Sequence, residues 1–347
     1  MARLLSWYHR VARDLPWRRT RDPYAIWVSE TMLQQTRVDT VTPYYERFLR
    51  ELPTLQSLAE APEERVLGLW SGLGYYRRAR MLHAAARRVV REHGGRLPEE
   101  AQQLRGLEGV GAYTAGAVSS IAFGRREALV DGNVARVLAR LFALDDEVVS
   151  SAGKARVWRL AERLMKHAPG EPGDWNQALM ELGATVCTPR DPRCAGCPVS
   201  TACLARARGI ARELPRISAR REPVTVRRVA LVLTSSSRVV LARRRPGALF
   251  GGLWEPPGAN GGARELTRLA RRLELDPRSL EPVGEVRHVL THRRLHVAVA
   301  RGSLGRRRRW EVPSAEYDAI EAVALGDLAE LAQARLSRKL LALAGVL

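Results

Sequence analysis

The four cysteines of this 347-residue chain constrain its fold most, because all of them fall within one segment of 17 residues. They are Cys187, Cys194, Cys197 and Cys203, in the spacing C-x6-C-x2-C-x5-C. Four thiolates on one short loop are the ligand set of a structural zinc or of a 4Fe-4S cluster. Only Cys194 and Cys197 form the close pair that zinc sites usually repeat. The spacing therefore favours the cluster over zinc, and over four unrelated buried cysteines.

The pattern of the chain changes once along its length. Up to about residue 205 the signals are helical, such as the apolar period of the run 77–93 and its stop at Gly94-Gly95. Residues 206–225 lose that period and gain proline and arginine, which is typical of a linker. Three apolar, β-branched runs then predict strands, with glycine and proline turns between them. These runs are residues 229–234, 238–242 and 295–300. We therefore expect an all-α domain over 1–205, a linker over 206–225 and an α+β domain over 226–347.

The charge balance indicates a polyanionic partner. Lysine and arginine number 57 against 37 acidic residues, a net charge of +20, and only three of the 57 are lysines. A GC-rich genome explains arginine in place of lysine, but not the excess of base over acid. No run of about 18 residues is apolar and free of charge, and we expect residues 325–347 to form an amphipathic surface helix. Residues 1–14 lack the apolar centre of a leader peptide. We therefore expect no membrane span and a cytoplasmic protein. Binding to DNA would associate it with the nucleoid.

Three glycines stand close together just before a run of small residues. They are Gly106, Gly109 and Gly111, and the small residues follow from Ala112 onward. Glycines permit left-handed turns, and the helix after them offers free amide groups to a phosphate. The segment is a helix-hairpin-helix signature, although a plain connector between helices remains the alternative when the segment is read alone.

Several long motifs now carry a resemblance that covers almost the whole chain. Besides the glycine hairpin and the cysteine loop they are Leu15–Arg18 (LPWR), Trp27–Thr36 (WVSETMLQQT), Gly72–Tyr76 (GLGYY) and Leu129–Val137 (LVDGNVARV). In this order they resemble the MutY-type adenine DNA glycosylases of the endonuclease III superfamily. The resemblance implies a helix-hairpin-helix glycosylase domain in two lobes, with a 4Fe-4S cluster in the loop 187–203 and double-stranded DNA held across the cleft.

The chemistry of such a site needs an acid and a carboxylate. Cleavage of a purine N-glycosidic bond leaves positive charge on the sugar and negative charge on the departing base. Burial between Val28 and Met32 would raise the pKa of Glu30, and the resemblance makes Glu30 the acid that protonates adenine N7. Asp131 would then be the ionised partner, which stabilises the sugar cation or attacks it transiently. Read alone, Glu30 is a solvated helix charge and Asp131 a helix cap, and only the family's fold puts them in one pocket.

The resemblance gives further residues a role. Tyr113 occupies the place of the lysine that attacks the sugar in bifunctional members, so we expect a monofunctional enzyme without an efficient lyase step. Tyr113 and Asn133 would position Asp131 and the sugar. Gln177 would pair with the edge of the extruded adenine, although an exposed helix amide is the alternative. The expected DNA contacts come from Gln35 and Tyr75, at the family's intercalating positions, and from Gly109 and Gly111.

The second half resembles the Nudix-like C-terminal domain of the same family. Its helix over residues 264–272 lacks the cluster of glutamates that holds magnesium in a Nudix hydrolase, so we do not expect nucleotide hydrolysis. The family recognises 8-oxoguanine through an aromatic-serine-histidine loop, which stands here as Leu290-Thr291-His292. Leu290 departs from that pattern, as does Glu108, where the hairpin usually carries proline. The arginine run 306–309 is expected to be a solvated loop that attracts phosphate.

The expected function is therefore excision of adenine opposite 8-oxoguanine or guanine, by a monomer that needs no membrane. A related glycosylase of other base specificity, such as one for thymine at mismatches, is the first alternative, against which the Nudix-like domain argues. A catalytically silent protein that binds damaged DNA is the second. The presence of both Glu30 and Asp131 argues against it.

Overall fold

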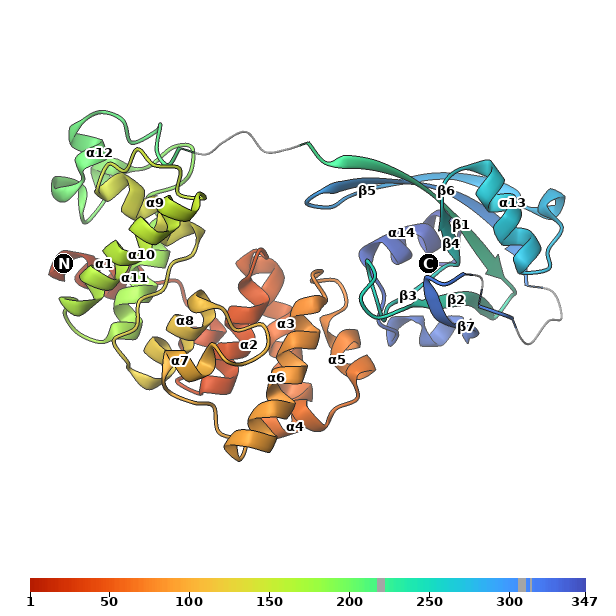
Figure 1. Cartoon of the computed structure of the whole chain (residues 1–347), viewed down its shortest axis with the longest axis horizontal. Coiled ribbons are helices and arrows are strands. Elements are labelled where there is room, and N and C mark those ends of the chain that lie inside the picture. The colour runs from red at the N-terminus through yellow and green to blue at the C-terminus, as the bar shows by residue number, and fades with distance from the viewer. Residues whose placement is uncertain (217–221, 305–309, 313) are drawn as a thin grey trace. The chain divides into compact units, whose positions relative to one another are not determined.

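The structure is a computed structural model that describes residues 1–216, 222–304, 310–312 and 314–347 (Figure 1). The arginine run 306–309 and residues 217–221 of the expected linker lie outside these ranges. The chain divides into two compact units. The first comprises residues 1–60 and 81–219, and the second residues 61–80 and 220–347. Each unit is described by itself below.

The first unit is helical, as expected. Its helices are α1 (Ala2–Val11), α2 (Pro23–Leu33), α3 (Val38–Glu51), α4 (Leu55–Glu60), most of α6 (Arg77–His93), α7 (Ala101–Leu104), α8 (Ala112–Phe123), α9 (Gly132–Leu141), α10 (Ser151–Lys166), α11 (Pro172–Thr185) and α12 (Leu204–Ala207). Short 3-10 turns span Pro16–Arg18, Cys194–Gly196 and Ser200–Ala202. The helix predicted over 77–93 is confirmed with both of its ends.

Four helices in contact form the centre of this unit. Helix α2 packs against α8, and α11 packs against both α8 and α9. Asp22 begins α2 by accepting hydrogen bonds from the amides of Tyr24 and Ala25 (3.1 and 3.3 Å), and α2 is then buried on all sides from Tyr24 to Met32. The approach of α11 to α9 requires Gly183, since a Cβ there would lie 2.6 Å from Cβ of Asn133. Because α2 is buried from Tyr24 to Met32, its polar side chains in this range lie inside the unit.

The second unit is built on a mixed seven-stranded sheet. The strands are β1 (Val224–Thr234), β2 (Arg238–Arg244), β3 (Trp254–Glu255), β4 (Gly258–Asn260), β5 (Glu281–Val289), β6 (Arg293–Ser303) and β7 (Tyr317–Ala324). The order is β3-β2-β1-β6-β5, with β4 paired to β1 and β7 to β2. Only β1 and β6 run parallel among the described pairs; their register places Val229 beside Ala298. The three predicted strands are confirmed and are longer than expected.

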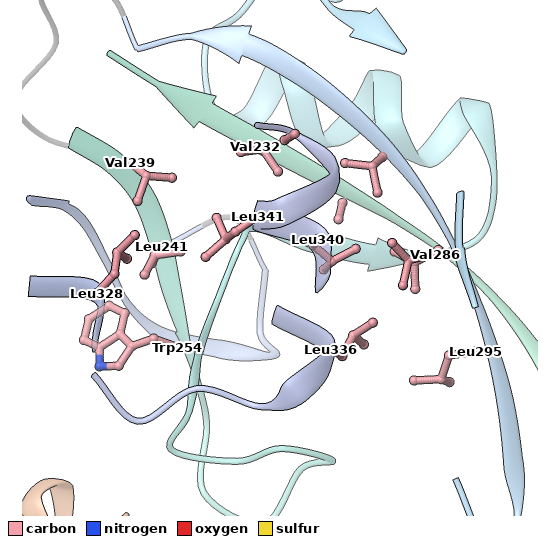
Figure 2. Packing of buried hydrophobic residues seen from close by; sticks show 14 residues of the cluster. Val232, Val239, Leu241, Trp254, Val286, Leu295, Leu328, Leu336, Leu340 and Leu341 are labelled. Atoms are coloured by element: carbon pink, nitrogen blue, oxygen red, sulfur yellow. The ribbon is translucent and has the colours of Figure 1, made fainter. Parts of the chain in front are cut away.

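Helices cover this sheet and close its core. Helix α13 (Ala263–Arg272) contacts β1, while α14 (Arg335–Leu343) contacts β5, β1 and β3. Figure 2 shows one core cluster, in which Leu336, Leu340 and Leu341 of α14 gather with strand residues such as Val232 and Leu241. All five are at most 2% exposed, which removes their apolar surface from water.

The helix expected over residues 325–347 was wrong as a single element. The structure has a 3-10 helix over Leu325–Ala329 and then α14 from Arg335. The segment between them runs beside β3: the amide of Trp254 donates to the carbonyl of Ala332 (2.8 Å), and Gln333 bridges to Trp254. These sheet contacts outweigh the helical period of the sequence. No described helix is long and apolar enough to cross a membrane.

Residues 61–80, which include α5 (Glu63–Trp70), pack within the second unit. The hydroxyl groups of Ser71 and Tyr76 both donate to the carbonyl of Gln333, at 2.7 and 2.9 Å. The indole of Trp254 donates to Glu64 at 3.0 Å. These three contacts fix the segment to residues that lie far away in sequence.

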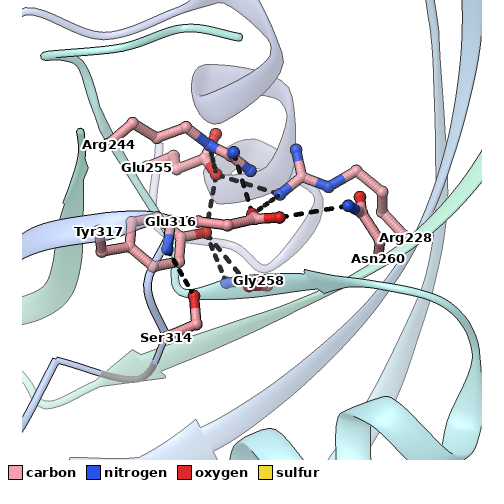
Figure 3. Close-up of polar contacts among 8 residues, drawn as sticks. All are labelled: Arg228, Arg244, Glu255, Gly258, Asn260, Ser314, Glu316 and Tyr317. Atoms are coloured by element: carbon pink, nitrogen blue, oxygen red, sulfur yellow. Dashed lines mark hydrogen bonds and ion pairs between the residues drawn. The ribbon is translucent and has the colours of Figure 1, made fainter. Parts of the chain in front are cut away.

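A buried ion-pair network joins β1, β2 and β3 of this unit with residues at the start of β7 (Figure 3). Arg244 lies 2.7 Å from Glu255 and 3.0 Å from Glu316, and Arg228 lies 3.4 Å from Glu255. The hydroxyl of Tyr317 donates to Glu255 at 2.9 Å. The two arginines are nearly fully buried, so removal of one partner would leave an uncompensated charge.

Candidate functional site

The first unit contains a cavity of about 870 Å³ that gathers the predicted catalytic residues. Glu30 comes from α2, Tyr113 from α8, Asp131 and Asn133 from the start of α9, and Gln177 from α11. Glu30 and Asp131, which are 101 positions apart in the sequence, therefore line the same cavity. The cavity also includes Gln35, Gly109 and Gly111 in its lining.

Glu30 is buried in the middle of α2. It is 4% exposed and lies between Val28 and Met32, which are both fully buried, so the alternative of a solvated helix charge is wrong. The hydroxyl of Tyr113 donates a hydrogen bond of 2.5 Å to its Oε2. Burial raises the pKa of Glu30 to about 7, and the charge of Asp131 adds to the rise, while the Tyr113 hydrogen bond and Arg18 oppose it. A carboxyl with this pKa can hold or release a proton near neutral pH.

Asp131 both caps α9 and faces the cavity. Its Oδ1 accepts from the amide of Val134 (2.7 Å), and its Oδ2 accepts from Nδ2 of Asn133 (2.8 Å). Burial raises the pKa of Asp131, and these two hydrogen bonds act against the rise because they favour the charged form. Asn133 is held in turn by Arg136, whose Nη2 donates to its Oδ1 at 2.8 Å. The helix cap expected from the sequence read alone is therefore real, and it points a carboxylate into the cavity.

Gln177 is 7% exposed on α11 and lines the cavity. The alternative of an exposed helix amide is therefore wrong. An amide in this position can donate to and accept from the edge of a flat polar ring.

Three further residues of the cavity wall were missed by the sequence reasoning. Glu181, whose side chain is fully buried, accepts from Arg13 (2.7 and 2.9 Å) and from Arg18 (2.7 Å). Burial alone would raise the pKa of Glu181, but the two arginines lower it below its usual value. Glu181 lies one helical turn after Gln177 on α11, and that spacing, together with Arg18 in the LPWR motif, was the available signal.

The glycine hairpin forms a tight turn before α8. Gly109 has φ of 77°, and a Cβ at this position would lie 2.7 Å from Cβ of Met81, so the turn requires glycine. Gly111 is the N-cap of α8. Gln35, exposed directly after α2, has φ of 59° and lies on the rim of the same cavity. Glu108 lies 3.7 Å from Arg88, which balances its charge.

Tyr75 and Thr291 belong to the second unit and touch there. Their hydroxyl oxygens are 2.7 Å apart. Tyr75 is 47% exposed and has φ of 51°, and the guanidinium of Arg78 lies 5.4 Å from its ring centre. His292 is exposed beside Thr291. Two residues that the sequence placed in different domains thus form one exposed polar group.

The helix after β4 does not resemble a metal-binding helix. Within α13 the only carboxylate belongs to Glu265, which lies 2.6 Å from Arg268. The buried carboxylate of Glu255 and the half-buried carboxylate of Glu316 are paired with arginines instead. Helix α13 therefore has one paired carboxylate where the expected metal-binding helix would carry several.

The four cysteines line one small cavity of the first unit. All are free thiols, and burial raises the pKa of Cys197, with the other three thiols adding to the rise. Arg140 is 1% exposed and holds the loop by donating to the carbonyls of Thr188 (2.6 Å) and Pro189 (2.8 Å) and to Sγ of Cys187 (3.3 Å). Within the described residues no group of three or more metal-binding side chains converges as a single ion requires. The four thiols around one hollow supply the donor set that a metal cofactor with sulfur ligands needs.

Comparison with known proteins gives two family matches. Residues 28–166 match the HhH-GPD superfamily of base excision DNA repair proteins, and residues 228–343 match the NUDIX domain. The first match includes Glu30 and Asp131 but not Gln177, and the second includes the sheet of the second unit from residue 228 of β1 onward.

The adenine DNA glycosylases of rat and human are similar in sequence. The rat protein is 40% identical over an alignment of 353 positions, which covers 84% of this chain and 68% of that protein. The human protein is 53% identical over 214 residues, which cover 59% of this chain, so the chain spans 39% of the human protein's length. Among solved structures, a thermostable thymine-DNA glycosylase matches with a TM-score of 0.55 and 34% identity, over 60% of this chain and 94% of that one. The chain therefore belongs to the adenine DNA glycosylase family, within the HhH-GPD superfamily of base excision DNA repair proteins.

Proposed function

We propose that this chain is a monofunctional adenine DNA glycosylase that acts on adenine mispaired with 8-oxoguanine or guanine in double-stranded DNA. It hydrolyses the N-glycosidic bond and leaves an abasic site. The observation that carries the proposal is the shared cavity, in which a protonatable Glu30 and the hydrogen-bonded carboxylate of Asp131 line the same hollow.

Glu30 acts as the general acid. A pKa of about 7 keeps a large share of the carboxyl protonated at neutral pH, and protonation of adenine N7 makes the base a better leaving group. The hydrogen bond from Tyr113 fixes the direction of the carboxyl group. A group with an ordinary pKa at this place would be deprotonated before the base arrived.

Asp131 acts as the anion that stabilises the sugar cation. Ionising both carboxyl groups would place two negative charges in one cavity, so a proton on Glu30 and a charge on Asp131 support each other. Asn133 and the amide of Val134 hold the charged oxygens in place. The two carboxyl groups thus divide the roles of acid and anion.

The remaining residues of the first unit bind the base and the DNA. Gln177 pairs with the edge of the extruded adenine, and Gly109 and Gly111 let the hairpin amides approach a phosphate. Gln35, on the rim, enters the base stack from which the adenine has left. Tyr113 stands where bifunctional members carry a lysine, so this pocket has no amine that could form a Schiff base. The DNA strand therefore stays intact.

A 4Fe-4S cluster is held by Cys187, Cys194, Cys197 and Cys203. The proposal is supported by the cavity that the four thiols share and by the buried Arg140 beside it. The cluster supplies structural order to a loop with few apolar residues to bury. Since Arg136 donates to the carbonyl of Cys187 (2.8 Å) and to Asn133, the ordered loop helps to fix the start of α9.

The second unit recognises the base opposite the adenine. Thr291 and His292 read 8-oxoguanine, and Tyr75 enters the stack beside it; the support is the direct contact of Tyr75 with Thr291. Residues 1–205 accordingly carry catalysis and residues 226–347 carry lesion recognition, with 206–225 as the linker. Residues 61–80 lie within the range 1–205 in sequence, but they belong to the second unit and support lesion recognition there.

The test is incubation of the purified chain with duplexes that carry adenine opposite 8-oxoguanine, guanine, cytosine or thymine, followed by alkali. We expect cleavage after alkali for the first two duplexes only, and an intact strand without alkali. A duplex with thymine opposite guanine tests the other base specificity. Release of thymine, or of no base at all, would contradict the proposal.

A further inference from the structure

A second cavity of about 520 Å³ lies in the first unit beside the catalytic one. The two cavities share three consecutive lining residues, Val130, Asp131 and Gly132. A Cβ at Gly132 would meet no atom within 4 Å, so the backbone between the cavities is open to approach. A chain-like ligand seated in the catalytic cavity can therefore continue across this backbone into the second one.

The wall of the second cavity is mainly apolar. Val148 and Trp158 are at least partly buried there, whereas Val149 is 49% exposed and so accessible to a ligand. An aromatic ring beside branched aliphatic groups is suited to the face of a sugar or a nucleobase.

One cation of this cavity remains available to a ligand. Lys154 is exposed on α10, and within the described part of the chain it forms no ion pair. The other two cations are engaged: Arg136 donates to the carbonyls of Cys187 and Gly183, and Arg212 pairs with Asp191 at 2.8 Å. The lysine thus adds one unbalanced positive charge to an apolar hollow.

We propose that the second cavity binds the nucleotide next to the extruded adenosine on the same strand. Its phosphate contacts Lys154, and its sugar and base lie against Val149 and Trp158. This inference rests on the proposed function, because it takes the catalytic cavity as the seat of the extruded nucleotide. Neighbouring nucleotides are joined by one phosphate, so the strand that leaves the first cavity must lie near its border, and the backbone of 130–132 is that border.

The test measures binding to a duplex that cannot react. The probe carries a tetrahydrofuran abasic analogue opposite 8-oxoguanine, and its Kd is measured by fluorescence anisotropy over a range of salt concentrations. For Lys154→Ala we expect a Kd about tenfold higher and a slope of log K against log salt that is smaller by about 0.9, the change for one lost phosphate contact. The matched control is Lys166→Ala, an exposed lysine on the same helix that lines neither cavity, for which we expect the wild-type slope.

A scan of the strand locates the contact. Single neutral methylphosphonate groups replace the phosphates on either side of the analogue, one per duplex. At one position Lys154→Ala should cause no further loss of affinity, because the contact is already absent, while at the other positions its tenfold loss should persist. A wild-type slope for Lys154→Ala, or an equal loss at every position, would overturn the proposal.

The same preparation separates this inference from the proposed function. Wild-type protein is assayed for adenine release from the matching duplex with adenine. If it releases none, the proposed function fails, whatever the salt slopes show. If it releases adenine while Lys154→Ala binds as the wild type does, the second cavity has another occupant. Slower release of free adenine by Lys154→Ala, with unchanged Kd, would show that the cavity is a product path and would also overturn the inference.

Discussion

At the scale of single residues, Glu30 shows opposing effects on one carboxyl group. Burial raises its pKa and the hydrogen bond from Tyr113 lowers it, with a result of about 7. Its apolar neighbours Val28 and Met32 made burial predictable from the sequence. The hydrogen bond was not predictable, because Tyr113 is 83 positions away and only the packing of α8 on α2 brings it near.

The raised pKa predicts a dependence of stability on pH. The folded state keeps the Glu30 proton at pH values where the unfolded chain has lost it, so the contribution of Glu30 to stability should fall as pH rises from about 4.5 to about 7. Residue 30 does not titrate in Glu30→Gln. The free energy of unfolding of this variant, relative to that of the wild type, should therefore increase over this range by about 1 to 3 kcal/mol. Urea unfolding at pH 5 and pH 7.5 measures it, with exposed Glu171→Gln as control. A difference in free energy of unfolding between variant and wild type that does not change with pH would contradict the raised pKa of Glu30.

Tyr113 offers a gain of function. In Tyr113→Lys we expect some strand cleavage at the abasic site, because an amine in this cavity can attack the sugar carbon after the base has left. Trapping with borohydride should give a covalent complex of protein and DNA. Tyr113→Phe, which loses the hydrogen bond but adds no amine, is the control and should give none. Absence of a trapped complex with Tyr113→Lys would count against the match of this position to the family's lysine.

At the scale of elements, local sequence predicted the parts that obey local rules. The helix over 77–93 and the strands of the second unit have clear periods, and both were found. The C-terminal segment was not, since the pairing of Gln333 with Trp254 is a contact between distant residues. The group of Arg13, Arg18 and Glu181 was missed for the same reason, because Glu181 is more than 160 positions away from both arginines.

Helix α9 and the cysteine loop depend on one buried arginine. Arg140 is 1% exposed and satisfies carbonyl groups of the loop that would otherwise be unpaired. Arg140→Met keeps an unbranched apolar stem but removes the guanidinium and these hydrogen bonds, so we expect iron well below the content of about four atoms per chain that the proposed cluster requires. Iron analysis and visible absorbance measure the loss. Arg156→Met, an exposed arginine on α10, should keep the full content; equal iron in both variants would contradict this account of the loop.

At the scale of the whole molecule, the proposed function gives the excess of positive charge and the two units a common substrate. The net charge of +20 suits a polyanion of any sequence, so it supplies affinity and little selectivity. Selectivity has to come from the residues that touch bases. The division into a helical and a sheet unit was predictable from the change in pattern near residue 205. The place of residues 61–80 in the second unit was not, because their helical sequence carries no sign of their partner.

The contact between Tyr75 and Thr291 predicts coupled effects on lesion preference. We expect Tyr75→Phe and Thr291→Val each to reduce the ratio of adenine release opposite 8-oxoguanine to release opposite guanine by several fold. The double variant should lose little more than either single one, because both remove the same 2.7 Å contact. Single-turnover rates on the two duplexes give the ratio. Thr267→Val, at a half-buried threonine on α13, should leave the ratio unchanged, and independent, additive losses would show that the two hydroxyl groups act separately.

The most direct test of the central claim is single-turnover adenine release by Glu30→Gln, with duplex binding measured on the same preparation. The account predicts binding within a few fold of wild type and a rate of release lower by at least about 10³, since general acids contribute about 10² to 10⁴ and this one has no substitute in the cavity. Glu127→Gln, a glutamate whose pKa burial also raises but which does not line the cavity, should release adenine at the wild-type rate. Release at a near wild-type rate by Glu30→Gln would contradict the assignment of the acid.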